Sequence, residues 1–313
     1  MGSSCAGIPG AFFTKAVPNP FTNSVKCLMV NQVKKASGKM EDFNLFKLAN
    51  SLVRAGAPED VAREIADKVS LQVTPSLHTR HIFRMAKKLL RQYNRATGMR
   101  YSIKRAIYAL GPTGYPFEKY VARILKAYGY NVEVNRIIKG YCVTHEVDVL
   151  ASRDDRRCVI ECKHHANGVK PADIKIALYV HSRFNDIRKA FEISEHQNSH
   201  VHEGWLVTNT RCSADAIKYA ECVGLKIVSW RYPEKDSLEM MIESKRLYPV
   251  TILPAATKSA IQSLTSRDII LVDEIASMDQ QTFLGKSGLD RANALSIKRE
   301  ADELCCASPN KPL

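Results

Sequence analysis

Residues 145–150 (His-Glu-Val-Asp-Val-Leu) and 157–163 (Arg-Cys-Val-Ile-Glu-Cys-Lys) predict two strands joined by the polar turn Arg153-Asp154-Asp155. Because strand side chains alternate between two faces, Glu161 and Lys163 project from the same face. A hairpin brings Asp148 alongside them, because directly opposed residues have Cβ atoms only about 5 Å apart. The pattern predicts two carboxylates and an ammonium group on one face of a sheet.

Two carboxylates beside one ammonium group suit a hard divalent cation. Mg²⁺ (or Mn²⁺) takes oxygen ligands and usually keeps several waters, so we expect Asp148 and Glu161 as metal ligands. Lys163 could orient or deprotonate a water for attack on a phosphate. The alternative is three solvated charges on an outward strand face, since charged residues are mostly exposed.

The order of helices and strands around this hairpin favours a metal site over three solvated charges. A predicted helix at 114–125 and a strand at 130–138 precede it, and a helix at 172–193, a strand at 205–208, a helix at 214–222 and a strand at 225–230 follow it. This order resembles the Mrr-like restriction endonuclease domain of the PD-(D/E)xK nuclease superfamily over about residues 111–232. The resemblance implies an α/β fold in which a mixed sheet is flanked by helices.

The resemblance also implies a set of site residues. These are the metal ligands Asp148, Glu161 and the Cys162 carbonyl, the catalytic lysine Lys163, and Glu118 as the auxiliary acid on the first helix. Val147 stands in place of the proline in the family's first motif. That proline varies among these enzymes, so the implied metal ligands are unchanged. The implied activity is metal-dependent hydrolysis of DNA.

The helix at 172–193 offers further cations near the predicted site. Lys175 and His181 are candidates for contact with DNA phosphates, and the alternative for both is a simple surface role. His164 and His165 directly follow Lys163 and could reach the waters of the metal, but histidines at a strand exit are also commonly just exposed.

The chain is basic, with a net charge of +14 from 46 Lys and Arg against 32 Asp and Glu. No acidic residue lies between Asp67 and Glu118. On the predicted helix at 79–96 the basic residues form one stripe and apolar residues form another. Such a helix can dock on a core and still face a polyanion such as DNA, although charge runs often only solubilise a protein.

The region before this nuclease-like part predicts a basic β-hairpin followed by three helices. This arrangement resembles the ATP-cone, a nucleotide-sensing module, over residues 31–98. The matching positions are Val33, Lys34, Lys35, Gly38 and Lys47, and the resemblance implies that ATP or dATP binds there as an effector. Ala36-Ser37 departs from the family pattern, which leaves open whether ATP, dATP or neither binds. The competing prediction is a basic helical module that contacts DNA directly.

The other segments have weaker signals. Residues 1–30 are predicted to be a disordered lead, 99–110 a linker helix, and 111–250 the endonuclease domain. Residues 251–313 predict a C-terminal helical segment, in which 284–289 resembles a helix-hairpin-helix turn that grips a DNA phosphate. A plain helical cap is the alternative for this turn.

The cysteines indicate the compartment. The chain has nine cysteines but no C-x-x-C pair, which argues against a zinc ribbon. Cys158 and Cys162 alternate with Glu161 and are predicted to be core thiols. Free thiols without a secretory signal predict a cytoplasmic protein, and no apolar run is long enough to cross a membrane.

These predictions combine into a metal-dependent DNA endonuclease of the restriction or defence type, regulated by ATP or dATP. The first alternative is a catalytically silent, nucleotide-responsive DNA-binding regulator. The second is a structure-specific repair nuclease or resolvase. Because one site cuts one strand, double-strand cleavage predicts a homo-oligomer or two successive nicks.

Overall fold

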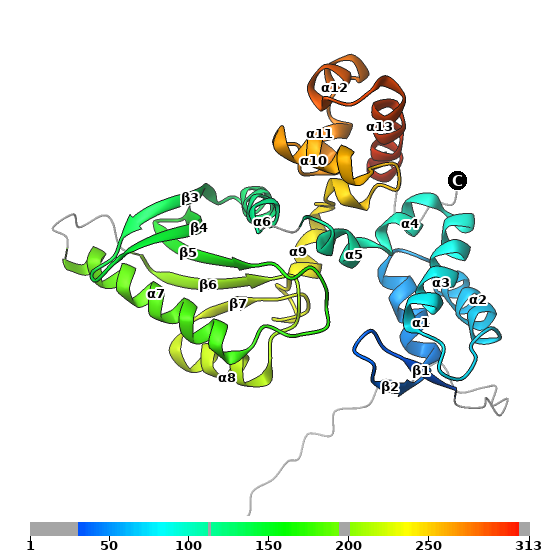
Figure 1. Ribbon diagram of the computed structural model, residues 1–313, viewed down its shortest axis with the longest axis horizontal. Coiled ribbons are helices and arrows are strands. Elements are labelled where there is room, and N and C mark those ends of the chain that lie inside the picture. Colours follow the sequence, from blue (N-terminus) through cyan, green and yellow to red (C-terminus); the bar gives the residue numbers. More distant parts are fainter. Residues whose placement is uncertain (1–30, 112–113, 194–200, 307–313) are drawn as a thin grey trace, which may run out of the picture.

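The computed structural model describes residues 31–111, 114–193 and 201–306. The predicted disordered lead at 1–30 therefore lies outside the described residues. Three parts follow one another along the chain: a small N-terminal part, a five-stranded α/β part and a C-terminal helical part (Figure 1).

The α/β part is built on one mixed sheet with the strand order β3-β4-β5-β6-β7. These strands span Asn131–Lys139, Thr144–Arg153, Arg156–Lys163, Glu203–Thr208 and Lys226–Val228. β3, β4 and β5 pair antiparallel, whereas β5, β6 and β7 pair parallel. Asp154 and Asp155 join β4 to β5 with φ of 51° and 61°, as a tight two-residue hairpin turn requires. The predicted mixed sheet is confirmed.

Helices cover both faces of this sheet. α7 (Ile174–Ile193) and α8 (Ala214–Val223) lie on one side, and α6 (Tyr115–Ala127) lies on the other (Figure 1). The alternation of β5 and β6 explains this layering. Ile160 and Trp205 pack in the cluster that contains α6, whereas Leu206 packs with Val180 of α7.

The N-terminal part has the predicted arrangement of a hairpin and three helices. β1 (Gln32–Lys34) and β2 (Met40–Asp42) pair antiparallel, and α1 (Leu45–Arg54), α2 (Glu59–Ser70) and α3 (Thr79–Tyr93) follow. It has its own apolar cluster, centred on side chains such as Leu52, Val69 and Leu90. The third helix ends before the predicted residue 96, because Asn94 is extended and caps the next helix through Thr97 N.

The predicted linker helix at 99–110 is largely helical and packs into the main core. The chain forms α4 (Arg95–Arg100) and α5 (Ile103–Tyr108) here. Met99, Ile107 and Leu110 are almost fully buried and belong to the main core of the α/β part. Burying these apolar side chains in the core is favourable, whereas a solvent-exposed connection would leave them in contact with water.

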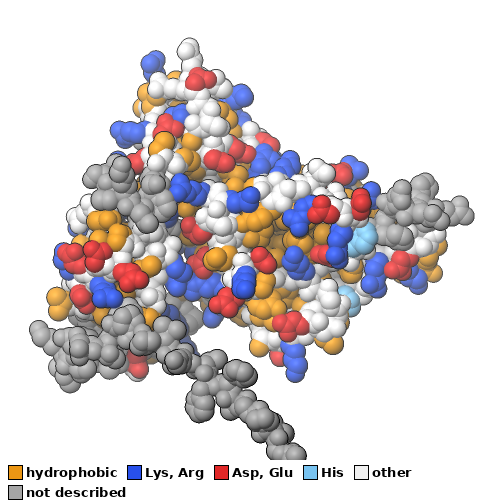
Figure 2. All heavy atoms as spheres, turned by 180° about the vertical axis from the view of Figure 1, so that it is seen from behind, with side chains coloured by type: hydrophobic (Ala, Val, Ile, Leu, Met, Phe, Trp, Pro, Cys, Tyr) orange, Lys and Arg blue, Asp and Glu red, His pale blue; other side chains and the backbone are white. Residues whose placement is uncertain are grey.

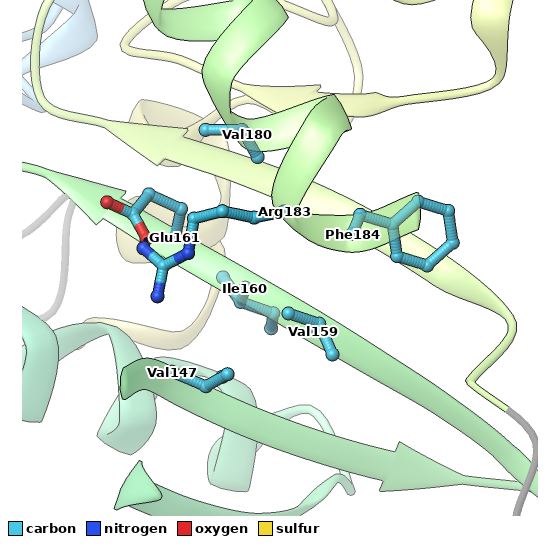
Figure 3. A pocket seen from close by; sticks show the side chains of 7 residues that line it. All are labelled: Val147, Val159, Ile160, Glu161, Val180, Arg183 and Phe184. Carbon is cyan, nitrogen blue, oxygen red and sulfur yellow. Dashed lines mark hydrogen bonds and ion pairs between the residues drawn. The ribbon is translucent and has the colours of Figure 1, made fainter. Parts of the chain in front are cut away.

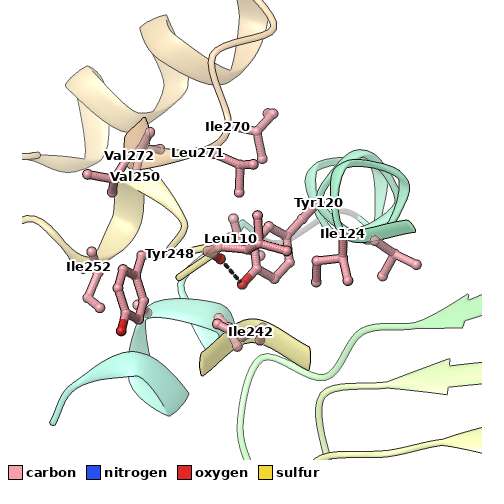
Figure 4. Packing of buried hydrophobic residues seen from close by; sticks show 14 of the residues in the cluster. Leu110, Tyr120, Ile124, Ile242, Tyr248, Val250, Ile252, Ile270, Leu271 and Val272 are labelled. Atoms are coloured by element: carbon pink, nitrogen blue, oxygen red, sulfur yellow. Dashed lines mark hydrogen bonds between the residues drawn. The ribbon is translucent and has the colours of Figure 1, made fainter. Parts of the chain in front are cut away.

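The C-terminal part shares the core of the α/β part. It contains α9 (Leu238–Lys245), η1 (Val250–Ile252), α10 (Lys258–Ser266), α11 (Val272–Ala276), α12 (Gln280–Ser287) and α13 (Arg291–Cys306). Figure 4 shows Tyr120 and Ile124 of α6 packed beside Ile242, Tyr248 and Ile270. The predicted boundary at 250/251 therefore does not separate two cores.

The predicted helix-hairpin-helix turn forms between α12 and α13, with Gly288 in the left-handed region. Its backbone is already engaged by other groups of the protein. The Ser263 hydroxyl donates to the Ser287 carbonyl, and the Leu289 amide donates to the Ser287 hydroxyl. The turn is thus packed as a helical cap against α10.

None of the helices in the described ranges combines the length and the apolar character needed to cross a lipid bilayer.

Tyr120 gives a test of the shared core. Its side chain is 0% exposed, and its hydroxyl donates to the Leu247 carbonyl at 2.7 Å (Figure 4). Tyr120→Phe leaves this buried carbonyl without its donor, so we expect a loss of about 1–3 kcal/mol in the free energy of unfolding. Denaturant unfolding measures it, with the exposed Tyr141→Phe as the control. Equal stability of the two variants would contradict the shared core.

Candidate active site

The three residues of the predicted site lie at neighbouring strand positions. Asp148 is on β4, and its Oδ2 accepts the Cys162 amide of β5 at 2.7 Å. Glu161 and Lys163 flank Cys162 on β5, while Cys162 itself is buried in the core on the opposite face. The structure therefore brings Asp148, Glu161 and Lys163 together and places the thiols of Cys158 and Cys162 in the core, as predicted.

Two further carboxylates join this pair, Glu118 at the start of α6 and Glu146 on β4. Burial, followed by the charges of Asp148, Glu146 and Glu161, raises the pKa of Glu118 to about 7. Burial and Asp148 raise the pKa of Glu161 to about 7, and burial raises the pKa of Asp148. The charged forms of these groups repel each other, so Glu118 and Glu161 bind protons more readily than usual near neutral pH, and a bound cation would relieve this repulsion.

Arg183 of α7 is the direct counter-ion of Glu161. Its Nη1 lies 2.5 Å from Glu161 Oε2 and 3.2 Å from the Tyr179 hydroxyl. Its Nη2 donates to the Glu146 carbonyl. Figure 3 shows the two side chains meeting among the apolar side chains of Val147, Val159 and Val180, which line a small cavity of about 10 Å³.

Lys163 occupies a different position from Arg183. Its side chain is exposed, and its positive charge lowers the pKa of both Asp148 and Glu161. In the parts of the chain that the structure describes, it makes no ion pair within 4 Å. The ammonium group is therefore close to both carboxylates and remains available to another partner.

The carboxylates of this cluster are candidate ligands for a divalent cation. Within residues 31–111, 114–193 and 201–306, no three His, Cys, Asp or Glu side chains are arranged to hold a metal ion. Asp148 and Glu161 nevertheless supply hard oxygen atoms in a site with excess negative charge, which suits Mg²⁺ or Mn²⁺. An open pocket of about 290 Å³ lies beside Asp148, Glu146 and Arg183.

The histidines have structural contacts. His164 Nε2 donates to the Ile107 carbonyl of α5 at 3.0 Å, and its ring lies 5.4 Å from the ring of Phe117. The His165 amide donates to Asn209 Oδ1. His181 lies 2.8 Å from the Tyr219 hydroxyl and 3.0 Å from Asn185 Nδ2. These contacts account for His164 and His181 without a phosphate.

The sequence-based prediction counted Arg183 among the cations near the site but selected Lys175 and His181 on α7, and it gave Glu146 no role. Lys175 is exposed. A usable signal was present, because Lys175, Tyr179 and Arg183 follow one another at four-residue spacing and therefore share one face of α7. Arg183, the third residue on that face, contacts the Glu161 carboxylate.

The predicted nucleotide residues surround an acid of their own hairpin. Glu41 forms ion pairs with Lys35 and with Lys47, the latter at 2.8 Å. Gly38 has φ of 84° in the β1–β2 turn, and Lys34 is half-buried. Val33 is only 4% exposed, so its side chain belongs to the core of the N-terminal part.

The carboxylate cluster predicts a pH-dependent stability. The folded-state pKa of Glu118, about 7, exceeds its ordinary value of 4.5. The stability that this group contributes is therefore fully present below pH 4.5 and lost as pH rises through about 7. In EDTA, we expect Glu118→Gln to raise the melting temperature at pH 8 and to change it little at pH 4.5.

The exposed Glu234→Gln is the control for this measurement. A Glu118→Gln variant that melts below wild type at pH 8 would show that repulsion does not govern this site.

Comparisons with known proteins agree with this geometry. Residues 111–232 match a family model described as restriction endonuclease, of the Mrr catalytic type, and residues 248–305 match one described as AF1548-like, C-terminal. The N-terminal part at 31–98 lies outside both matched ranges. The resemblance of the α/β part to this nuclease family is confirmed, and the predicted C-terminal helical segment is an AF1548-like domain.

A relative from Archaeoglobus fulgidus, an uncharacterized protein, is 36% identical over 184 residues, which are 59% of this chain and 99% of the relative. A solved structure, of the protein of unknown function AF1548, is 35% identical with a TM-score of 0.54. It covers 63% of this chain and 100% of its own. The chain therefore belongs to the AF1548-like family, with an Mrr-type restriction endonuclease domain at residues 111–232.

Proposed function

We propose that this protein is a metal-dependent endonuclease that hydrolyses phosphodiester bonds of DNA, of the restriction or defence type. The observation that carries this proposal is the cluster of Asp148, Glu161 and Glu118 beside Lys163, whose ammonium group has no ion-pair partner among the described residues. The match of residues 111–232 to a restriction endonuclease family supports it.

Asp148 and Glu161 would hold the divalent cation, with the Cys162 carbonyl as a third oxygen ligand. When bound, such a cation polarises the scissile phosphate and lowers the pKa of its water. The Cys162 amide fixes Asp148 through its 2.7 Å hydrogen bond. Lys163 would orient the attacking water and hold the developing negative charge near the phosphate.

Arg183 explains how Glu161 is held when no cation binds it. The guanidinium group neutralises this carboxylate at 2.5 Å, and Tyr179 and the Glu146 carbonyl fix the position of the guanidinium group. A cation that binds Glu161 would free Arg183 for the negatively charged DNA. We propose this exchange of partners as a step of substrate binding.

Cleavage assays test this function. Plasmid DNA is incubated with Mg²⁺ or Mn²⁺, with and without EDTA, using wild type, Lys163→Ala and the exposed control Lys258→Ala. We expect metal-dependent cutting that falls at least about a hundredfold in Lys163→Ala, the usual scale of a lost general acid or base. The control should cut like wild type.

Cutting that persists in EDTA, or full activity of Lys163→Ala, would refute the assignment. DNA binding without cleavage under either metal would instead support the catalytically silent regulator. Preference for branched over linear DNA would support a repair nuclease or resolvase. The size of the protein on DNA tests the proposed homo-oligomer, because each site cuts one strand.

We further propose that ATP or dATP regulates this activity by binding at the N-terminal hairpin. Lys35 and Lys47 converge on a single carboxylate, Glu41, which a triphosphate could displace. A thermal-shift titration with ATP, dATP and GTP measures this. At a hundredfold excess of free ligand over Kd, stabilisation should be about 2.7 kcal/mol.

Lys47→Ala should abolish this shift. Lys68→Ala is the matched control, because Lys68 is also an exposed lysine paired with a glutamate, at 2.5 Å from Glu64. No shift in wild type, or an equal shift in Lys47→Ala, would contradict the proposed nucleotide site.

The seven cysteines in the described part of the chain are free thiols, which supports the proposed cytoplasmic location.

A further inference from the structure

A group of cations that form no ion pair within the described ranges extends over two parts of the protein. It consists of Arg84 and Lys87 on α3, Lys104 and Arg105 on α5, and Arg211 between β6 and α8, and it is called the basic band here. Within the described ranges, none of these five forms an ion pair within 4 Å. Cations on the C-terminal side differ, since Arg123 pairs with both Asp268 and Glu274.

The members of the basic band are close enough to repel one another. Burial, followed by the charges of Arg91 and Arg105, lowers the pKa of Lys87. Burial, together with Arg84, lowers the pKa of Arg105. Burial, together with Arg231 and Arg211, lowers the pKa of Lys104, against the opposing charge of Glu239. Because Arg105 of α5 also lies against Phe83 of α3, the band passes from α3 to α5.

Aromatic rings hold two of these cations in place without neutralising them. The Arg105 guanidinium lies 3.7 Å from the centre of the Phe83 ring, which in turn stacks on Tyr101 at 4.9 Å. The Lys104 ammonium lies 5.4 Å from the ring of Trp230. Contacts with ring faces orient a positive charge and leave it free to bind an anion.

The basic band also adjoins the candidate active site. α5 is fixed to the end of β5 by the bond from His164, the residue after Lys163, to the Ile107 carbonyl. Arg211 follows the end of β6, whose Thr208 is paired with Lys163. Figure 2 shows Lys and Arg side chains gathered where the N-terminal part meets the α/β part.

We propose that the basic band binds the sugar–phosphate backbone of DNA, so that the N-terminal part and α5 extend the contact that begins at the active site. This inference rests on the proposed function for its choice of DNA. A duplex carries one negative charge per about 1.7 Å of its axis, which matches a continuous row of cations better than a single small anion does.

The proposal is tested by binding rather than by cleavage. Fluorescence anisotropy with a labelled duplex is measured in EDTA over a series of salt concentrations, for the full chain. We expect the double variant R84Q/R105Q to bind roughly tenfold more weakly or worse. Its log–log salt slope should be smaller by about two, since each lost phosphate contact lowers that slope by about one.

Two further variants make the result specific. R291Q/R299Q removes two exposed arginines of α13 and should bind like wild type. R84K/R105K keeps both charges and should restore most of the affinity, which a misfolded protein would not do.

Wild-type affinity and slope in R84Q/R105Q would overturn the inference, as would binding to anionic phospholipid vesicles but not to DNA. The outcome is independent of the proposed cleavage. If wild type cuts DNA and R84Q/R105Q binds normally, the inference fails while the function stands. If R84Q/R105Q loses affinity and wild type never cuts, the inference stands and the nuclease function fails.

Discussion

The alternation of side chains along β5 is the constraint on which both the core and the candidate site depend. Ile160 and Cys162 enter the main core, so the strand cannot shift by one residue without burying Glu161 and Lys163 there. Burying two charges in an apolar core would cost far more than the fold could recover. The register of β5 thus fixes the positions of the Glu161 carboxylate and the Lys163 ammonium group together. The Cys162 amide, which donates to Asp148, holds the second carboxylate beside them.

α6 connects this site to the AF1548-like C-terminal domain. Glu118 lies in its first turn, where burial and the charges of the other carboxylates raise the pKa of Glu118. Tyr120 and Ile124, further along the helix, pack in the shared core. On the surface, Lys119 pairs with Asp268 at 2.9 Å, and Arg123 pairs with Glu274 at 2.7 Å. The C-terminal domain therefore holds the helix that positions one of the site's acids, which gives this domain a role in the geometry of the site.

The parts that could be predicted from sequence are those that depend on local periodicity. The hairpin and the joint position of Asp148, Glu161 and Lys163 follow from period-two alternation, whereas the mixed sheet was implied by the family resemblance that the order of elements carries. Arg183 was not selected, because its contact with Glu161 joins α7 to β5 and depends on how the helix packs on the sheet. The burial of Met99 and Ile107 was not predicted for a similar reason, since their buried partners come from the folded α/β part.

The protein carries two opposite and adjoining charge imbalances. Around the first half of β4 and the end of β5, four carboxylates face two cations, Arg183 and Lys163, and burial together with the carboxylates' repulsion raises the pKa of Glu118 and Glu161. Across α3 and α5, the cations of the basic band form no ion pair within 4 Å in the described ranges. Because α5 is tied to the end of β5, one extended ligand can reach both regions. A polyanion that arrives with divalent cations would relieve both imbalances together, which neither a metal ion nor an anion does alone.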